Sequence, residues 1–518
     1  MELRSWGIAT LALTALYSQQ AAFAAQPTAA ELRASVRTYR ERHEPAIVRE
    51  FAQLLAISNH ASDTTNTRKN AEHIAQLLRA RQIETRLLEL DGAPPVVFGQ
   101  LDSPGATKTV TFYAHYDGQP AVASDWTVDP FRPTLRGAGG DGKIIDLDAL
   151  PTRLDPEWRL FARSASDDKA PIIAVLAAID ALRAAAVAPS VNLKFFFEGE
   201  EEVGSPHLAA LLKTHAPALQ TDLWIICDGP VHQNGQKLVF FGVRGVAALE
   251  ITVYGPNRGL HSGHYGNWAP NPIVLLTHLL VSMRDTRSRI LIPGFYDDVL
   301  ALTPAELQAA RAMPDYDEQI KRELGIARTE AEPASLQTQL MLPALNVRGI
   351  AAGRVGAAAA NVISPEATAS IDFRLVRDQR PERVRERVEE HVARQGYYIV
   401  RQPPDAATRA AHPLIARLAW AQEAHYPAAR TRLDDPMAQR AAAVVEEMTG
   451  ASIVVAPTLG GSVPMYLFKG SSDTPVIGVP LANFDNNQHA SDENLRLQNL
   501  WDAIEIFAGL FVLHQPRH

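Results

Sequence analysis

Cysteine is almost absent from this sequence, because Cys227 is the only one among 518 residues. The chain can therefore form no internal disulfide, even in an oxidising compartment. Cys227 ends the apolar run Leu223–Cys227. In such a run a buried, unreactive thiol is a better expectation than a nucleophile.

Long apolar runs and clusters of basic residues are also missing. Beyond residue 24, no apolar stretch approaches the ~18 residues that a membrane-spanning helix needs. No segment is rich in lysine or arginine, and the net charge is -8, which argues against nucleic acid as a partner. With 46% hydrophobic and 21% charged residues, the composition is typical of a soluble globular protein. The length favours two domains.

The first residues have the pattern of an export signal. Met1–Arg4 is short and charged, and Gly7–Tyr17 is apolar but too short to cross a membrane as a stable helix. Ala22 and Ala24 are small residues at the two positions that a signal peptidase reads. We expect a signal peptide at residues 1–24, cleaved after Ala24, and a periplasmic or secreted protein that does not bind a membrane. The alternative is an uncleaved anchor.

Strand-like and helical segments alternate through the first part of the chain. Buried-strand patterns over 108–114, 191–197 and 222–227 are separated by helical patterns such as 172–186. This order is typical of an α/β sheet with largely parallel strands and flanking helices. The Gly- and Asp-rich segment 136–157 has neither period, so we expect a long surface loop there.

From residue 244 the pattern changes to several antiparallel strand candidates and two helices. That pattern suggests a small α+β domain of ferredoxin-like type, inserted into the first domain. We therefore predict a larger α/β domain with a mixed, mostly parallel sheet, made from residues 25–243 and 405–518. The inserted domain is predicted to span 244–404.

Polar residues fall repeatedly where the predicted strands of the larger domain give way to loops. In open α/β sheets that edge is where ligands bind. Further acidic and imidazole side chains come from a helix start and from a polar loop near the C-terminus. The residues that we expect to meet at this edge are His115, Asp117, Asp167, Glu201, Glu202, Asp228 and His489.

Two imidazoles and three carboxylates suit zinc, manganese or cobalt better than calcium, and suit a thiolate or iron–sulfur site poorly. A central carboxylate between two histidines makes a dinuclear centre natural, in which each ion also keeps one histidine. Two such ions would bring the pKa of a bridging water near neutrality and clamp a substrate carbonyl. Asp117 can hold the His115 imidazole in the right tautomer. Glu201, beside a ligand but free itself, can act as general base.

Each feature has an ordinary explanation when it is taken alone. Phe195–Ser205 runs from an aromatic strand into four glutamates, and by itself it could be a solvated acidic turn. A single His-x-Asp is more often an ordinary core or surface histidine. Asp167 and Asp168, before a helix, can be no more than an N-cap. The metal-site interpretation depends on the combination.

Taken together and in order, these motifs resemble those of the M20 metallopeptidases. The motifs are His115-Tyr-Asp-Gly-Gln-Pro120, Ser166-Asp-Asp-Lys169, Glu198-Gly-Glu-Glu-Glu-Val-Gly-Ser205, Asp228, Leu260-His-Ser-Gly263, Gly460-Gly-Ser-Val-Pro464 and His489. Within the family, the chain looks most like the carnosinase and cytosolic non-specific dipeptidase branch, including an insertion around Ile290–Pro293. The similarity covers roughly residues 40–510.

The resemblance implies a dinuclear centre in the larger, catalytic domain. His115 and Asp228 would bind one ion, Glu202 and His489 the other, and Asp167 would bridge them. Zn²⁺ is the first expectation, with Mn²⁺ or Co²⁺ as alternatives.

The resemblance also implies roles around the metals. Asp117 would orient His115, and Glu201 would activate water and then protonate the leaving amine. The inserted domain would serve as lid and dimer contact, with His261 reaching the active site of the partner in a homodimer to stabilise the oxyanion. Arg374 would grip a substrate carboxylate. The pocket would be lined by Gly460, Gly461 and Ser462.

Three features depart from the family pattern. Ala162-Arg-Ser-Ala-Ser166 replaces the usual glycine-containing approach to Asp167, Gly118 replaces a common valine, and the 136–157 loop is longer than expected. All three are expected near the mouth of the pocket, and none removes a ligand. Substrate preference is therefore the property that they would change.

The resulting hypothesis is an exported, dinuclear metal-dependent hydrolase of small peptides, either a dipeptidase or a carboxypeptidase that releases a C-terminal residue. An N-acyl amino acid deacylase would need the same metals and base, and is the first alternative. The second is a metal- or peptide-binding protein without catalysis. A retained general base, Glu201, argues against that second alternative.

Overall fold

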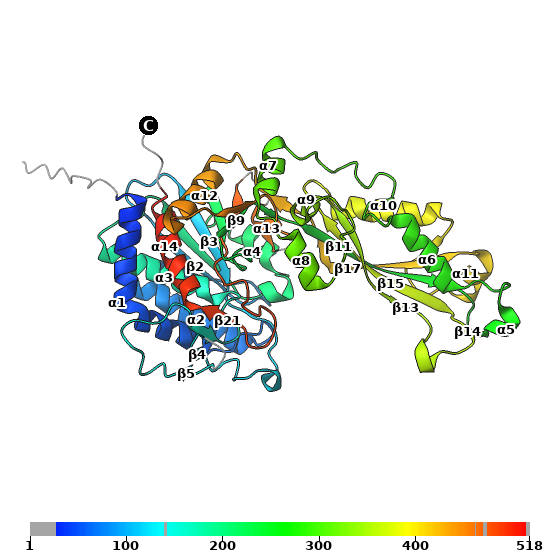
Figure 1. Ribbon diagram of the computed structural model, residues 1–518, viewed down its shortest axis with the longest axis horizontal. Coiled ribbons are helices and arrows are strands. Elements are labelled where there is room, and N and C mark those ends of the chain that lie inside the picture. The colour runs from blue at the N-terminus through cyan, green and yellow to red at the C-terminus, as the bar shows by residue number, and fades with distance from the viewer. Residues whose placement is uncertain (1–26, 139–141, 462, 470–473, 514–518) are drawn as a thin grey trace, which may run out of the picture.

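The computed structural model describes residues 27–138, 142–461, 463–469 and 474–513. The expected signal peptide and Ser462 lie outside these residues. The described chain forms a larger domain, which holds the first and last described residues, and a smaller, elongated one beside it (Figure 1). In these ranges no helix combines the length and the apolar character that crossing a bilayer requires.

An eight-stranded mixed sheet forms the centre of the larger domain, as the sequence predicted. In spatial order its strands are β1 (Glu84–Leu88), β2 (Val96–Leu101), β7 (Asn192–Glu198), β3 (Thr109–His115), β8 (Leu223–Ile226), β20 (Val476–Gly478), β9 (Leu238–Phe240) and β19 (Val454–Ala456). The central strands β7, β3 and β8 run parallel. Their carboxyl ends therefore meet at one edge, which places the following loops side by side.

Helices cover both faces of this sheet, and each face packs against a different set of helices. One face packs against α1 (Ala29–Leu55), α2 (Thr64–Ala80), α3 (Lys169–Ala184), α12 (Pro436–Thr449) and α14 (Leu497–Phe511). The other packs against the short helices α4 (Leu208–Thr214) and α13 (Met465–Lys469). Phe195 and Phe197 point to the first core and Phe196 to the second, as strand alternation requires. The aromatic run before the glutamates is therefore buried on both sides.

The segment 136–157 differs from the expected featureless loop. It contains β5 (Ile144–Ile145), which forms a hairpin with β4 (Thr134–Arg136). Together with β6 (Arg159–Phe161) and β21 (Asn494–Arg496) these strands form a separate four-stranded sheet. A two-residue strand is too short to give a periodic signal, which explains why the sequence pattern missed it.

The smaller domain is the expected α+β insertion. Its five-stranded sheet has the order β13 (Ala344–Ala351), β15 (Glu366–Leu375), β11 (Gly245–Tyr254), β17 (Ile415–Tyr426) and β16 (Tyr398–Val400). Two helices pack against it, α6 (Pro272–Met283) and α10 (Pro381–Arg394), and they bury alternate residues of the strands. Further helices lie outside this core: α7 (Pro304–Ala312), α8 (Asp317–Leu324), α9 (Leu336–Leu340) and α11 (Ala406–Ala411).

The inserted sheet extends beyond residue 404, where the sequence pattern placed the end of the domain. β17 pairs with β11 from Ile415 to Tyr426, so this segment belongs to the smaller domain. The pattern was misleading because Ile415–Tyr426 is rich in alanine, which favours helix in isolation. Pairing along a neighbouring strand overrides that local preference.

The two passages of the chain between the domains lie next to each other. β10 (Gly242–Val243) pairs antiparallel with β18 (Ala429–Arg430). Glycine is required here because a Cβ on Gly242 would lie 2.5 Å from the carbonyl oxygen of Ala429.

Candidate metal centre

The carboxyl edge of the central strands gathers the residues expected to bind metal. His115 ends β3, Asp228 follows β8, and Glu201 and Glu202 begin the short 3-10 turn after β7. Asp167 precedes α3, and His489 lies in the loop before β21. The ends of three strands, the start of one helix and one distant loop thus converge on one place.

Asp167 lies between the two histidines. Its Oδ1 is 2.9 Å from Nε2 of His115, and its Oδ2 is 3.0 Å from Nε2 of His489. The same His489 nitrogen is 3.2 Å from Oε2 of Glu202, and the His115 nitrogen is 4.0 Å from Oδ2 of Asp228. Asp167 therefore lies where it could be shared by two ions, with one histidine on each side.

The structure adds Asp168 to the set. Donor atoms of His115, Asp168 and Asp228 lie within 4.8 Å of one another, and so do those of Asp167, Glu202 and His489. Asp168 is 1% exposed, and neither of its carboxylate oxygens has a hydrogen-bond partner. The sequence showed Asp168 only as the second aspartate of a motif, with an N-cap as an adequate explanation. Its side chain makes no capping hydrogen bond to α3.

The electrostatics of the cluster indicate a deficit of positive charge. Burial and the charge of the neighbouring Asp167 together raise the pKa of Asp228 to about 7. Burial and the charge of Asp228 raise the pKa of Asp168 well above its usual value. Hydrogen bonds to Asp167 and Glu202 raise the pKa of His489 to about 10. Without ions, protons on histidine therefore supply the charge that balances the carboxylates.

These observations fit a pair of divalent cations. Buried carboxylate oxygens normally have partners, because leaving them without one is costly. Oδ1 of Asp228 and both oxygens of Asp168 lack a hydrogen-bond partner. Oxygen and imidazole donors in two adjacent groups are the ligand types that zinc and similar ions take.

Asp117 connects the metal ligands to the candidate base. Its two carboxylate oxygens accept hydrogen bonds from the backbone N–H groups of Glu201, at 3.1 Å, and Glu202, at 3.0 Å. Its Oδ1 also lies 3.4 Å from Nδ1 of His115. Asp117 is completely buried, so it fixes the turn that carries Glu201 relative to the ligand on the next strand.

The remaining glutamates of Phe195–Ser205 are supports. Glu198 accepts a 2.7 Å hydrogen bond from the Tyr113 hydroxyl, and burial raises its pKa to about 8. Glu200 accepts hydrogen bonds from the backbone and ring of His207, both at 2.8 Å.

Burial raises the pKa of the candidate base Glu201 well above its usual value, and the carboxylates of Asp228 and Asp167 add to the effect. A carboxylate of raised pKa suits proton transfer.

A buried glutamate, Glu493, holds the loop that carries Asp167. Its Oε1 accepts hydrogen bonds from the N–H groups of Ser166, at 2.9 Å, and Asp167, at 3.0 Å. Its Oε2 accepts from the guanidinium of Arg163, at 2.7 Å, and from the N–H of Ser164, at 3.0 Å. Sequence reasoning missed this residue, although its position four residues after His489 was an available signal.

The other predicted site residues lie outside the cluster. His261, in β12 (Leu260–His261), is exposed next to α5 (Ser262–Tyr265) at the end of the smaller domain farthest from the larger one (Figure 1). Arg374 pairs with Asp372 at 2.8 Å. A Cβ on Gly460 would meet Leu340 of α9 at 2.9 Å, whereas Gly461 faces open space.

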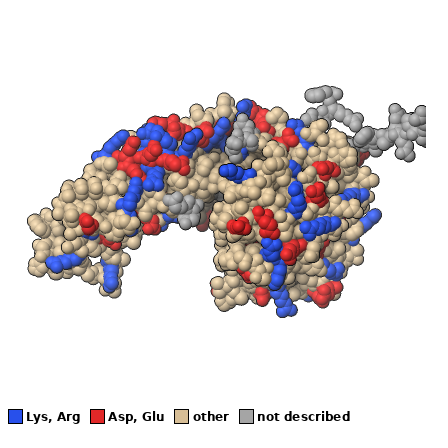
Figure 2. All heavy atoms as spheres, turned by 180° about the vertical axis from the view of Figure 1, so that it is seen from behind, with Lys and Arg blue, Asp and Glu red and all other residues tan. Residues whose placement is uncertain are grey.

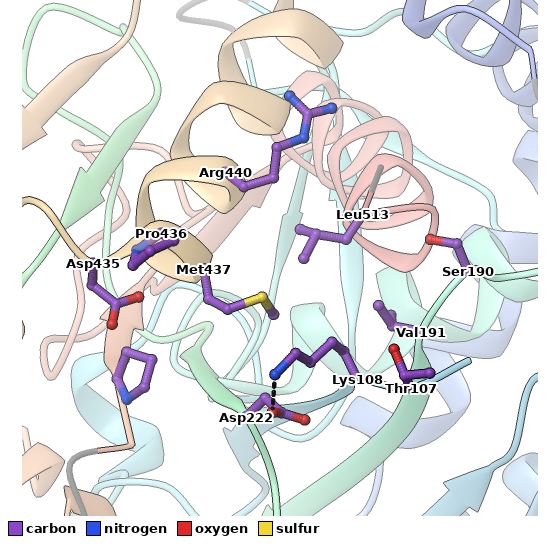
Figure 3. A pocket seen from close by; sticks show the side chains of 11 residues that line it. Thr107, Lys108, Ser190, Val191, Asp222, Asp435, Pro436, Met437, Arg440 and Leu513 are labelled. Atoms are coloured by element: carbon purple, nitrogen blue, oxygen red, sulfur yellow. Dashed lines mark hydrogen bonds and ion pairs between the residues drawn. The ribbon is translucent and has the colours of Figure 1, made fainter. Parts of the chain in front are cut away.

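A cavity of about 810 Å³ lies at the opposite edge of the sheet (Figure 3). Lys108 and Asp222, which form a 2.8 Å ion pair there, precede β3 and β8, and α12 contributes Met437 and Arg440 to the lining. Because the cavity is at the amino ends of these strands, it takes no part in the metal cluster.

Comparison with known proteins agrees with this geometry. The model of Peptidase family M20/M25/M40 matches residues 111–512. The chain belongs to this family. Its resemblance to the carnosinase branch is also confirmed: it is 28% identical to the Cys-Gly metallodipeptidase dug1 of Schizosaccharomyces pombe, over 80% of this chain and 81% of that protein. It is 26% identical to the human Beta-Ala-His dipeptidase, over 81% and 77%.

Solved structures of M20 peptidases have the same fold. The metallo-carboxypeptidase Sso-CP2 from Sulfolobus solfataricus matches with a TM-score of 0.70 and 24% identity, over 90% of this chain and 98% of that one. Human carnosine dipeptidase 1 matches with a TM-score of 0.68 and 22% identity, over 94% and 99%. This M20 protein is therefore a metallopeptidase with the two-domain architecture of the family.

Proposed function

We propose that this M20 enzyme is a dinuclear metallodipeptidase that is exported from the cytoplasm. Its relatives named above include a Cys-Gly metallodipeptidase and a Beta-Ala-His dipeptidase, and they align along most of their length. The observation that carries the proposal is the position of Asp167 between two imidazoles, with Glu201 beside the cluster. A binding protein has no use for a half-buried glutamate that lies next to its metal ligands without being one of them.

Two divalent ions, when bound, would lower the pKa of a water molecule and polarise the scissile carbonyl. His115, Asp168 and Asp228 would hold one ion, and Glu202 and His489 the other, with Asp167 between them. We propose zinc first, since two imidazoles with carboxylates suit it, with manganese or cobalt as alternatives.

The protein's own residues would handle the proton. Glu201 accepts the proton of the attacking water and delivers it to the nitrogen of the leaving amine. Removal from water, the main cause of its raised pKa, favours holding that proton between the two steps. Asp117 keeps the backbone of Glu201 fixed during both transfers, because its carboxylate accepts a hydrogen bond from the Glu201 N–H.

The smaller domain would supply substrate recognition. Arg374 adjoins Arg244, whose pKa burial and the charge of Arg374 lower to about 10. Two neighbouring guanidinium groups suit the free carboxylate of a dipeptide or of a peptide C-terminus. Gly460 and Gly461 would leave backbone donors accessible, and Ser462 is the third predicted member of that pocket.

A homodimer completes the proposal, because His261 lies far from the metal cluster of its own chain. Within the smaller domain, α6 presents an outward face of Ile273, Val274 and Val281, which are 37%, 50% and 64% exposed. By contrast, α10 carries alternating charges along its outer face (Figure 2). An apolar helix face beside a solvated one is a feature of an association surface, and we propose that α6 meets a second copy of the chain.

The decisive test is a substrate panel with the mature protein, from residue 25, reconstituted separately with zinc, manganese and cobalt. Unblocked dipeptides, longer peptides and N-acetyl amino acids separate a dipeptidase, a carboxypeptidase and a deacylase. We expect unblocked dipeptides to be cleaved fastest. Glu201→Gln, with unchanged metal content, should lower kcat by about 10²–10⁴-fold.

Two outcomes would contradict the proposal. Preferred cleavage of N-acetyl amino acids would identify a deacylase, and no hydrolysis by any metallated form would leave a binding protein. Export has its own test, since a tagged full-length chain should be processed after Ala24 and recovered outside the cytoplasm. Recovery of an unprocessed chain in the cytoplasm would overturn that part alone.

A further inference from the structure

Two of the departures from the family pattern, Gly118 and Ser164, lie in contact. A Cβ on Gly118 would be only 2.3 Å from Oγ of Ser164, and 3.0 Å from Nδ2 of Asn59. No real Cβ reaches the first distance, so the Ser164 hydroxyl occupies the space that a side chain at position 118 would need. Asn59 and Ser164 are both fully buried, so neither can swing out into solvent.

The Ser164 hydroxyl connects two segments behind the metal ligands. It donates a 3.3 Å hydrogen bond to the carbonyl oxygen of Asp117 and accepts a 2.8 Å hydrogen bond from Nδ2 of Asn59. Nδ2 of Asn59 also donates to the carbonyl of Tyr116 at 2.8 Å, and the backbone carbonyl of Asn59 accepts from the N–H of Gly118 at 3.1 Å. Hydrogen bonds with Asn59 and Ser164 therefore hold Tyr116, Asp117 and Gly118, the three residues that follow β3.

The backbone of Ser164 is held in a conformation that serine seldom adopts. Its φ is 61°, which is unfavourable for a residue with a Cβ and natural for glycine. The Glu493 carboxylate accepts the Ser164 N–H at 3.0 Å, and the Ser164 carbonyl accepts the N–H of Lys169 at 3.1 Å. A serine that is kept at a glycine position, although glycine would be less strained, points to a use for its hydroxyl.

We propose that Ser164 is a positioning residue for the His115–Asp117 segment, and that Gly118 is matched to it by leaving room for its hydroxyl. The carbonyl that receives the Ser164 hydrogen bond lies 3.2 Å from Nδ1 of His115. Ser164 also belongs to the loop that carries Asp167. It thereby sets the orientation of one histidine ligand relative to the central carboxylate. This inference rests on the proposed metal centre and deepens it.

The variants Ser164→Gly, Ser164→Ala, Gly118→Ala and Ser164→Gly/Gly118→Ala test the pair, in the cobalt-loaded full-length mature protein. Three readouts are needed: kcat and KM on a cleaved dipeptide, the visible absorption spectrum of bound cobalt, and the melting temperature. Ser288→Gly is the matched control, since Ser288 has a φ of 64° and lies in a hairpin of the smaller domain.

Ser164→Gly should melt no lower than the parent, as Ser288→Gly should, because glycine relieves the backbone strain. Its kcat should nevertheless fall about tenfold, with little change in KM and an altered cobalt spectrum. Ser164→Ala should show the same loss of kcat. Gly118→Ala should lower kcat in the parent but have little further effect in the Ser164→Gly background, since contacting residues are not additive.

A parental kcat and cobalt spectrum in Ser164→Gly would overturn the proposal, and so would additive losses in the double variant. If the parent protein cleaves no peptide at all, the proposed function fails. The cobalt spectra still decide whether Ser164 positions the ligands.

Discussion

The carboxylate of Glu493 accepts a hydrogen bond of 3.0 Å from the backbone N–H of Asp167, although 326 positions separate the two residues in the sequence. Asp167 is the central carboxylate of the metal cluster, and Glu493 follows His489 by four residues. One buried side chain therefore keeps two of the ligand-bearing loops together. The relative position of the two predicted ions depends on this contact.

Glu493→Gln should destabilise the protein and weaken metal binding. The new amide would point N–H groups at backbone N–H groups and would leave the buried Arg163 guanidinium without its counter-charge, which costs about 3 kcal/mol in similar cases. The free energy of unfolding and the zinc content after dialysis are the measurements. Glu157→Gln, which breaks only a surface pair with Arg496, should cost less than about 1 kcal/mol. Equal effects of the two substitutions would contradict this role for Glu493.

Asp168→Asn should change stability in opposite directions with and without metal. In the metal-free protein the substitution removes one of several buried carboxylates, so the melting temperature should rise. In the metal-loaded protein it removes a ligand or a close neighbour of one, so zinc affinity should fall about 10–100-fold. Calorimetry of the metal-free form and a zinc competition titration provide the two readings. An unchanged zinc affinity would show that Asp168 is not part of the centre.

Glu198→Gln should flatten the dependence of stability on pH. Burial raises the pKa of Glu198 to about 8 from 4.5, so between these values the folded form retains a proton that the unfolded chain has lost. This contribution is complete below pH 4.5 and is lost as the pH rises through 8, by up to about 1.4 kcal/mol per pH unit. Glutamine keeps an acceptor for the Tyr113 hydroxyl. The difference between the urea unfolding midpoints at pH 5.5 and pH 7.5 should therefore be smaller in the variant than in the parent. An identical pH dependence would contradict the buried, protonated state.

Mixing two inactive variants should restore activity if the active site is shared between subunits. A Glu201→Gln chain still supplies His261, and a His261→Ala chain still supplies Glu201. Each mixed dimer would then contain one complete site. Random exchange should recover about one quarter of the parental activity, because half of the dimers are mixed and half of their sites are complete. No recovery after verified subunit exchange would exclude a role for His261 in the partner's site.

The residues that could be predicted are those with a local signature. His115, Glu202 and Asp228 lie at or shortly after the ends of buried strands, and parallel neighbours bring such positions to one edge of any α/β sheet. The mixed sheet and the inserted α+β domain followed from the same alternation of patterns, and family resemblance supplied the order of the ligands.

The missed residues act through contacts between distant parts of the chain. Glu493 is a polar residue in a polar loop until the fold brings it against Ser166 and Asp167. The role of Ser164 depends on a backbone conformation that no residue pattern specifies. The inserted domain was predicted to end too early, because only the pairing of β17 with β11 shows that Ile415–Tyr426 belongs to its sheet.

The short ladder between β10 and β18 has a consequence for the architecture. Val243 leaves the larger domain directly opposite Ala429, where the chain returns, and the two strands are antiparallel. Neighbours of this kind need only a two-residue turn to join them. A shortened gene in which such a turn joins Val243 directly to Ala429 would encode the larger domain with its strand order and its other connections unchanged. In the topology of this protein, the entire smaller domain occupies the position of one hairpin turn.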